Sequence, residues 1–436
     1  MESRDSFSSK FGIIAAAAGS AIGLGNIWRF PYVLGENGGG AFLLIYLVFI
    51  FLIGVPVMLS ELVIGRKSQR SVFGAFKVLA PDAKFFRLVG VMGVLAAFLI
   101  LSFYSVVAGW TVNYTLLALG GQLSDKSPDQ LSVLFEDFSG AVWRPMVYMI
   151  VFMVLTALIV AGGVKKGIEK YTKILMPVLL FIIAILCVKS ITLKGAGGGL
   201  SFLFKPDFSK ITADVVFEAL GQAFFSLSIG MGAIATYGSY VRKKENLLNT
   251  AISVSFADTL IAVLAGVAIF PAVFAFGIKP DVGPGLVFVT LPNVFNQMVG
   301  GYFFSVAFFV LLFIAALTSS VSMLEVVVSY FSEELKMSRR GAALLGAALI
   351  TVLGAVCVLV PSVFSQFNTI SSDYLLPLGG VLISVFAGWV LGRKKVQEEL
   401  EAHGKSVRFV GLLVIILKVF APIAITFVFL NNLGII

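Results

Sequence analysis

Apolar runs of about twenty residues recur along the whole length of this chain. A run of that length spans the hydrocarbon core of a bilayer as an α-helix. The chain has 436 residues, of which 59% are apolar and 13% charged, so no segment remains for a sizeable soluble domain. We therefore expect an all-α integral membrane protein with eleven transmembrane helices, at residues 11–34, 41–65, 88–118, 145–163, 168–189, 214–240, 247–277, 302–332, 341–361, 369–392 and 408–433.

Charge and composition limit where the chain lies and what it does. Most of its 32 lysine and arginine residues fall in segments on the same side of the expected spans as the N-terminus. By the positive-inside rule the N-terminus is then cytoplasmic, and eleven spans place the C-terminus outside the cell membrane. The net charge of +9 is explained by these loops, and we expect no nucleic-acid partner. The single histidine, His403, lies in a charged loop, so we expect no enzyme and no organic cofactor.

The first span contains residues that a lipid-facing helix avoids. Gly19, Gly23 and Gly25 are weak helix formers, and Asn26 and Arg29 are costly in hydrocarbon. This composition is typical of a membrane helix that breaks near mid-depth and whose freed backbone lines a polar cavity. A glycine-rich face that packs against neighbouring helices is the alternative from these residues alone.

The sixth span has a similar interruption at its centre. Ser226, Ser228, Gly230 and Gly232 weaken the helix over a few residues. Because the two broken spans are five apart, we expect two five-helix repeats inserted in opposite orientations, with a binding site between the breaks. The repeats would comprise residues 1–190 and 191–392, and residues 393–436 would add a cytoplasmic loop and the eleventh helix.

The fifth span has a weak point of its own. Gly167 and Pro177 are ten positions apart, and the proline removes one helical N–H donor. The cytoplasmic half of this helix could therefore unwind and admit water. An ordinary kink, which membrane helices tolerate, explains the same residues equally well.

Four segments resemble the neurotransmitter:sodium symporter family, in particular its bacterial amino-acid transporters. They are GSAIGLGNIWRFPY at 19–32, GENGGGAF at 35–42, GQAFFSLSIGMGAIATYGSYVRK at 221–243 and AALTSSVSMLE at 315–325. The resemblance covers essentially the whole chain. It implies a secondary transporter that moves an amino acid into the cell together with sodium by alternating access, with the bilayer, the amino acid and sodium as its partners.

The resemblance also implies two Na⁺ sites. One would use carbonyl oxygens of Gly19, Ile22 and Ala315 and the hydroxyls of Thr318 and Ser319. Without the resemblance, hydrogen bonds from these hydroxyls to their own helix are the simpler expectation. The second site would use the carbonyl of Ala21 and the side chains of Asn26, Ser226 and Asp258.

Asp258 departs from the pattern of the family's bacterial leucine transporter, which has an asparagine at this position. A lone carboxylate within an apolar span is functional by default. Chloride-dependent relatives bind an anion near this site, and a fixed carboxylate could supply the same charge. We therefore expect transport that does not need chloride.

The broken first span also indicates what kind of substrate binds. Free N–H groups near Gly23 and Gly25 favour an anion such as a carboxylate, and amine-transporting relatives have an aspartate at the position of Gly23. A substrate that brings its own carboxylate is an amino acid, and the apolar pocket favours a hydrophobic or aromatic one. By resemblance the pocket would comprise Ala21, Gly23, Gly25, Ile100, Tyr104, Phe225, Ser226, Ser228, Met231, Ser319, Ser320 and Met323.

Charged pairs are expected to close the two ends of the pathway. The outer gate would pair Arg29 with an acid of the tenth span, Asp373, with Gln222 nearby, although Asn368 competes for that position. The inner gate would comprise Arg4, Tyr240 and Glu333. Two further carboxylates lie within spans: we expect Glu61 to brace the broken sixth span and Glu325 to line the inner vestibule.

Other classes of membrane protein fit the sequence less well. A channel would show a symmetric filter loop, and an intramembrane enzyme would need a nucleophile with a base, or metal ligands. A substrate sensor on the transporter fold and a sodium symporter of another carboxylate-bearing solute stay open. Sodium-dependent uptake into proteoliposomes separates the sensor from the transporter.

Overall fold

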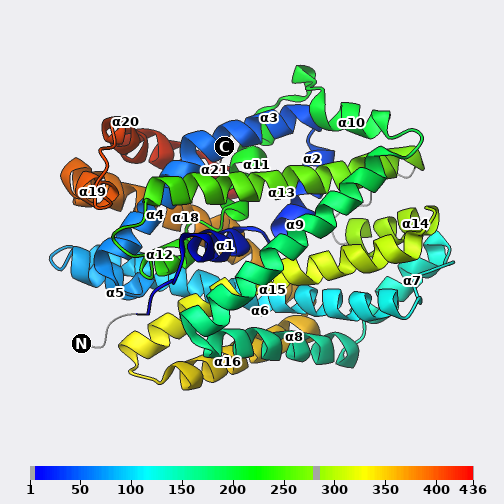
Figure 1. The fold of residues 1–436 in the computed structure, drawn as a ribbon, viewed down its shortest axis with the longest axis horizontal. Helices are drawn as coiled ribbons and strands as arrows, with labels where there is room; N and C mark the ends of the chain where they lie inside the picture. Colours follow the sequence, from blue (N-terminus) through cyan, green and yellow to red (C-terminus); the bar gives the residue numbers. More distant parts are fainter. Residues whose placement is uncertain (1–4, 278–284, 436) are drawn as a thin grey trace.

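The computed structural model describes residues 5–277 and 285–435, which are entirely helical or irregular. Within these residues nine helices are long and apolar enough to cross a membrane, and one bent helix pair makes a further span. Most of them run along the long axis of the molecule in Figure 1. The nine are Gly40–Ser68, Lys84–Leu119, Trp143–Ala161, Val164–Ile191, Leu247–Ala275, Gly301–Glu334, Arg339–Leu359, Pro361–Leu400 and Val410–Asn432.

The α-helical elements are shorter than the spans, because π-helical turns interrupt several of them. The helices labelled in Figure 1 or used below are α1 Lys10–Ala21, α2 Phe30–Glu36, α3 Gly40–Phe49, α4 Val55–Ser68, α5 Val72–Leu79, α6 Arg87–Leu119, α7 Pro128–Ser139, α8 Trp143–Ala161, α9 Lys170–Ile191, α10 Gly197–Phe204, α11 Ala213–Ser226, α12 Ala233–Gly238, α13 Leu247–Ala275, α14 Leu291–Asn296, α15 Gly301–Glu334, α16 Arg339–Leu359, α17 Pro361–Thr369, α18 Leu376–Val385, α19 Gly392–Leu400, α20 Val410–Ile415 and α21 Ala421–Asn432.

The first predicted break is confirmed. Helix α1 ends at Ala21, and the chain resumes as a π-helical turn, Gly25–Arg29, that continues into α2. The two halves meet at an angle of 54°. Ile22 has an extended backbone conformation with ψ 101°, so its peptide group leaves the helical ladder.

The second predicted break is also confirmed. Helix α11 ends at Ser226 and α12 begins at Ala233. Between them Ser228, Gly230 and Gly232 have φ values of 54°, 90° and 75°, in the left-handed region where glycine is the favoured residue. A Cβ at Gly230 would lie 2.4 Å from the carbonyl oxygen of Leu376, so the backbones approach closely here.

Glu61 braces this second break, as the sequence predicts. Its carboxylate, fully buried in α4, accepts hydrogen bonds from the backbone nitrogens of Gly230 at 2.7 Å and Ala235 at 3.1 Å. These N–H groups have no partner within a helix, and a carboxylate satisfies both.

The fifth span is helical from Val164 to Ile191, with Pro177 inside it. Its first turn is π-helical, and a Cβ at Gly167 would lie 1.9 Å from the carbonyl oxygen of Ile159. Glycine is therefore required for close packing against α8. Unwinding of this helix concerns another conformation and stays a prediction.

The tenth span is longer than the predicted 369–392. It begins at Pro361, whose fixed φ favours the first helical turn, and it continues through α19 to Leu400. The segment after Gly392, predicted as a loop, is helical because it is rich in lysine, glutamate and glutamine, which are good helix formers. Gly392 has φ 67°, so α19 changes direction at this residue.

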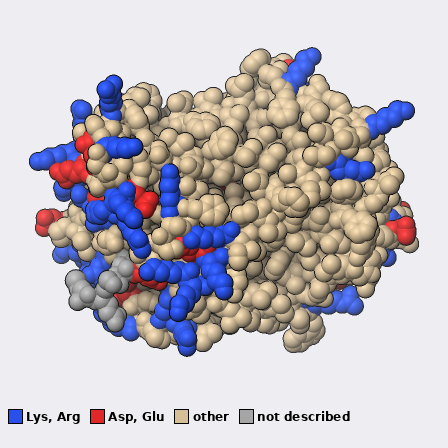
Figure 2. All heavy atoms as spheres, in the orientation of Figure 1, with Lys and Arg blue, Asp and Glu red and all other residues tan. Residues whose placement is uncertain are grey.

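Lysine and arginine side chains are concentrated at one end of the molecule. Figure 2 shows them crowded at the left, at the end where Figure 1 places α5, α19 and the N-terminus, and fewer at the right. Helices α7 and α14 lie at that opposite end. The wide middle of the visible face is nearly free of charge, as a surface in contact with lipid must be.

Candidate ion and substrate site

Polar side chains from three spans meet beside the first break. The Asn26 side-chain amide donates to the Asp258 carboxylate at 2.7 Å and to the Ser226 hydroxyl at 3.2 Å, and Ser226 donates to the second Asp258 oxygen at 2.7 Å. Each of the three is at most 1% exposed. The structure therefore brings together the side chains that the sequence predicts for one Na⁺ site, in a set of oxygen donors suited to a hard cation.

The cluster includes Tyr46, which the sequence analysis missed, and Gly23, which it placed in the substrate pocket. The hydroxyl of Tyr46, in α3, donates to Ser226 at 3.2 Å, and the backbone N–H of Gly23 donates to the Asn26 side-chain oxygen at 3.2 Å. The contact of Gly23 links the cluster directly to the broken backbone. Tyr46 resembles any aromatic residue of an apolar span, and only the packing of α3 against α11 shows its role.

The residues predicted for the other Na⁺ site lie between α1 and α15. A Cβ at Gly19 would lie 3.2 Å from the Cβ of Thr318, and the Ser319 hydroxyl donates to the Ser20 carbonyl at 3.2 Å. The Thr318 hydroxyl donates to the carbonyls of Ile314 and Ala315, both at 3.1 Å. Hydrogen bonds from these hydroxyls to carbonyls of their own helix are what the sequence alone predicts without the family resemblance. They leave the lone pairs of the hydroxyl oxygen available to a cation.

A small cavity of about 30 Å³ lies between the two breaks. Most of the predicted substrate residues line it, and the sequence analysis missed Leu376. Ser226 lies instead in the polar cluster with Asp258, and Ser320 is buried with no hydrogen-bond partner for its hydroxyl among the described residues. The lining residues are Ala21, Gly23, Gly25, Ile100, Tyr104, Phe225, Ser228, Met231, Ser319, Met323 and Leu376.

The backbone at the first break is bonded to a side chain that lines this cavity. The N–H of Leu24 donates to the hydroxyl oxygen of Tyr104 at 3.1 Å. A Cβ at Gly23 would lie 3.0 Å from the same hydroxyl and 3.0 Å from the Cβ of Ser319. The space beside these donors therefore exists only because residue 23 is glycine.

A larger vestibule of about 280 Å³ adjoins the cavity and shares Gly25, Tyr104 and Phe225 with it. The Arg29 guanidinium lies over the ring of Phe225 at 4.6 Å, a cation–π contact. The vestibule is lined by Leu24, Gly25, Trp28, Arg29, Tyr32, Phe103, Tyr104, Val107, Trp110, Phe225, Phe364 and Asn368.

The predicted outer gate is only partly assembled in this conformation. Arg29, Asp373 and Glu218 line one small pocket. Neither Arg29 nor Asp373 takes part in an ion pair among the described residues. Gln222, the third residue of the predicted gate, donates its side-chain amide to the Gly25 carbonyl at 3.5 Å. Asn368 faces the vestibule instead, so the register of the gate acid stays a prediction.

The opposite side of the site is closed. Tyr240 donates to Glu325 at 2.6 Å, and Arg339 donates two hydrogen bonds to the same carboxylate. Phe7, at 1% exposure, packs edge-on against Tyr240 and donates its backbone N–H to the Tyr240 carbonyl. Glu325 is therefore buried beneath the N-terminal segment and bonded on both sides.

The inner gate differs in its details from the expected arrangement. The Glu333 carboxylate accepts from the backbone nitrogen of Ser71 at 2.8 and 3.0 Å, at the start of α5. Arg4, its predicted partner, lies outside the described residues. The N-terminal segment is held by Glu169 of the fifth span, which accepts from Ser8 at 2.6 and 2.7 Å and from Ser9 at 3.0 Å.

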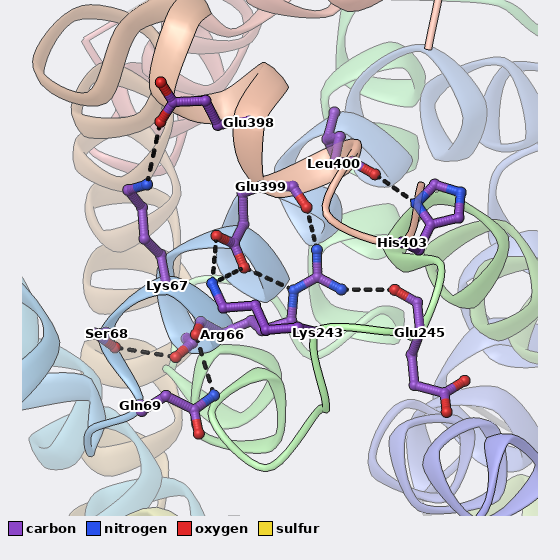
Figure 3. A network of polar contacts seen from close by, with 11 residues as sticks. Arg66, Lys67, Ser68, Gln69, Lys243, Glu245, Glu398, Glu399, Leu400 and His403 are labelled. Atoms are coloured by element: carbon purple, nitrogen blue, oxygen red, sulfur yellow. Dashed lines mark hydrogen bonds and ion pairs between the residues drawn. The ribbon is translucent and has the colours of Figure 1, made fainter. Parts of the chain in front are cut away.

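A buried ion-pair network ties together three segments at the end of the molecule with α5 and α19 (Figure 3). Arg66, at the end of the second span, donates to the Glu399 carboxylate at 2.7 Å and to the Glu245 carbonyl at 2.6 Å, and also donates to the Glu399 carbonyl. Lys243 donates to both oxygens of Glu399, at 2.8 and 2.7 Å. The sequence analysis missed this network because Glu399 resembles an ordinary charge of a solvated loop.

Comparisons with known proteins agree with the geometry. The model of the sodium:neurotransmitter symporter family matches residues 4–133 and 130–435. The sodium-dependent transporter YhdH of Bacillus subtilis is 39% identical over 99% of this chain and 98% of its own length. The human sodium- and chloride-dependent GABA transporter 2 is 25% identical over 91% of this chain and 75% of its own.

The chain belongs to the sodium:neurotransmitter symporter family. It is thus a multi-pass, sodium-dependent membrane transporter and not an enzyme, as the sequence predicts. A crystal structure of MhsT in complex with L-phenylalanine matches its fold with a TM-score of 0.92 and 46% identity, over 99% of this chain and 100% of MhsT.

Proposed function

We propose that this protein carries a hydrophobic or aromatic amino acid into the cell together with sodium. The observation that carries the proposal is the meeting of both broken helices at one cavity. The peptide N–H groups of Gly23 and Leu24, which bond to the side chains of Asn26 and Tyr104, lie outside the helical ladder and suit a carboxylate. The remaining cavity lining, including Met231 and Met323, is apolar and adaptable. The fold shared with MhsT, whose structure holds L-phenylalanine, supports this substrate class.

We propose two Na⁺ sites, each of which holds one ion. One would bind beside Asp258 with Asn26, Ser226 and the Ala21 carbonyl, next to the substrate carboxylate. The other would bind between Thr318, Ser319 and the carbonyls of Gly19, Ile22 and Ala315. Because the first ion and the substrate share the break at Ala21–Gly23, each raises the affinity of the protein for the other.

Transport is proposed to proceed without chloride. The buried Asp258 supplies a fixed negative charge beside the first ion, where an amide would leave the sodium charge uncompensated. The human relative named above is sodium- and chloride-dependent, as its name records.

Alternating access is proposed to arise from two inverted repeats, residues 1–190 and 191–392, with the eleventh helix outside them. The crowding of lysine and arginine at the end with α5 and α19 supports a cytoplasmic N-terminus. With the N-terminal segment closed over Tyr240 and the vestibule adjoining the site, this conformation is accessible from the outside. Arg29 with Asp373, and Glu333 with Arg4, are proposed to pair as the two gates close.

Uptake into proteoliposomes tests the proposal. A panel of labelled amino acids is offered to liposomes with an inward sodium gradient, with an inward potassium gradient, and with sodium plus gluconate in place of chloride. We expect sodium-driven accumulation of phenylalanine, leucine or a similar apolar amino acid in both anions. Sodium-dependent binding without accumulation would instead identify a sensor, and accumulation of a different carboxylate-bearing solute would identify the other alternative.

A further inference from the structure

The last span contains a lysine without an acidic partner. Lys418 lies within Val410–Asn432, and none of the ion pairs between described residues includes it. Its ammonium lies 4.9 Å from the ring centroid of Trp389, a residue of the tenth span that is 63% exposed on the outer surface. A cation at a lipid-facing position needs a counter-charge or a route to the interface.

The position of Lys418 is fixed by its neighbours. Pro422 has no N–H, so the Lys418 carbonyl loses its donor four residues along the helix. The indole N–H of Trp389 supplies one instead, at 3.2 Å. Gly388 permits this approach, because a Cβ there would lie 2.9 Å from the Cγ of Lys418. The side chain is therefore anchored at its base, at the contact between the tenth and eleventh spans.

A second cation lies at another contact between the same two spans. The Arg393 guanidinium packs over Gly411, with its central carbon 3.7 Å from a Cβ placed on that glycine. Both cations therefore lie at contacts between the tenth and eleventh spans. Arg393 meets Gly411, and Lys418, seven residues further along the eleventh span, meets Gly388. Neither cation is paired with an acid among the described residues.

An apolar hollow lies on the surface of the eleventh span, on the C-terminal side of Lys418. It holds about 250 Å³ and begins one turn beyond Lys418, lined by Pro422, Ile423, Thr426, Phe427 and Leu430. Ile423 and Phe427 are about half exposed, as expected of a surface that faces lipid tails. Two cations at one end and an apolar hollow at the other match the two parts of a phospholipid.

We propose that this face of the eleventh span, where it packs against the tenth, binds one anionic phospholipid of the cytoplasmic leaflet. Lys418 and Arg393 hold its phosphate, and one acyl chain lies in the hollow. Basic pockets between transmembrane helices on the cytoplasmic side recognise lipid headgroups in this way. A zwitterionic lipid has the same phosphate, but its own ammonium cancels much of the attraction. The site is separate from the transport pathway and does not depend on the proposed substrate.

Native mass spectrometry of the purified full-length protein tests this inference, without sodium or amino acid. Phosphatidylglycerol and phosphatidylcholine are titrated onto wild type, Lys418→Gln, Arg393→Gln and the matched control Lys395→Gln, an exposed lysine with no ion pair. We expect one phosphatidylglycerol that binds more tightly than phosphatidylcholine. Each of the first two substitutions should weaken that lipid about fivefold, and both together about thirtyfold, whereas the control should leave it unchanged.

Equal binding of the two lipids to wild type would overturn the proposal, as would unchanged phosphatidylglycerol binding in the double variant. Glutamine at 418 keeps the backbone carbonyl that Trp389 contacts, so the two spans should stay packed. Should Lys418→Gln nevertheless elute as an aggregate, the comparison of Arg393→Gln with Lys395→Gln decides the question by itself.

Discussion

The side-chain amide of Asn26 donates a hydrogen bond of 2.7 Å to the buried carboxylate of Asp258. This contact joins the break in the first span to the middle of α13, and Ser226 at the second break completes the set. A buried carboxylate held only by neutral donors keeps most of its negative charge uncompensated. The arrangement is therefore suited to a monovalent cation, and it places that cation where both broken helices end.

Replacing Asp258 with asparagine should make transport depend on chloride. The variant retains the shape of the site but lacks the fixed charge, so a mobile anion is needed to balance sodium. We expect the sodium affinity in gluconate to fall about tenfold or more and to recover partly in chloride. Uptake measured against sodium concentration in the two anions gives the answer. An identical response of wild type and variant to chloride would exclude this role.

Replacing Tyr104 with phenylalanine should weaken substrate binding. The variant lacks the hydroxyl that meets the Leu24 N–H and faces the cavity, and a hydrogen bond to a charged carboxylate contributes about 1.5–3 kcal/mol. We expect the affinity for the amino acid to fall at least about tenfold. Tyr114→Phe is the matched control, because that buried hydroxyl, in the same helix, has no partner among the described residues. Equal binding by the two variants would argue against a substrate contact.

Replacing Gly23 with alanine should abolish substrate binding while the protein still folds. The added methyl group would lie 3.0 Å from both the Tyr104 hydroxyl and the Ser319 Cβ, inside a cavity of about 30 Å³. Gly197→Ala serves as control, since a Cβ there meets nothing within 4 Å. Binding of labelled amino acid, together with gel filtration, separates a filled site from a misfolded protein. Substrate binding at the wild-type level would place the site elsewhere.

Replacing Glu399 with alanine should destabilise the protein strongly. The substitution leaves the guanidinium of Arg66 buried without its carboxylate, which costs about 3–5 kcal/mol. The neighbouring Glu398 is more than half exposed and lies 3.7 Å from Lys67. Replacing Glu398 with alanine should lower the free energy of unfolding by at most about 1 kcal/mol. Thermal unfolding of both variants in detergent compares them. A similar melting temperature for the two would show that the network in Figure 3 is dispensable.

Replacing Glu61 with alanine should loosen the second break. The backbone N–H groups of Gly230 and Ala235 would lose a charged acceptor, at about 1.5–3 kcal/mol each. We expect a lower melting temperature and faster amide hydrogen exchange at residues 228–235 than in wild type. Unchanged exchange in this segment would show that neighbouring helices hold it without the carboxylate.

The two breaks could be predicted because their residues conflict with the environment. Glycine, serine and asparagine are unfavourable at the middle of a lipid-facing helix. They are favourable where the helix breaks and lines a polar cavity. Glu61 was predicted as the brace for a similar reason, since a carboxylate in hydrocarbon needs donors and a broken helix supplies them. Most of the substrate-cavity residues follow from family resemblance rather than from physical patterns.

Contacts between distant segments could not be predicted in the same way. Glu399 pairs with Arg66 across more than three hundred residues, and its local sequence is that of an exposed helix. Glu169 holds Ser8 and Ser9, but nothing in the sequence distinguishes it from the lysine-rich turn around it. Such pairings depend on how whole helices pack, which local composition does not determine.

The most direct test of the account is the binding of labelled L-phenylalanine to the purified protein as the sodium concentration is varied at constant ionic strength. The account requires both broken helices to hold an ion and a zwitterion together. It predicts saturable binding that rises with sodium, disappears in potassium, and is matched by a higher sodium affinity when phenylalanine is present. Equal binding in sodium and potassium would contradict it.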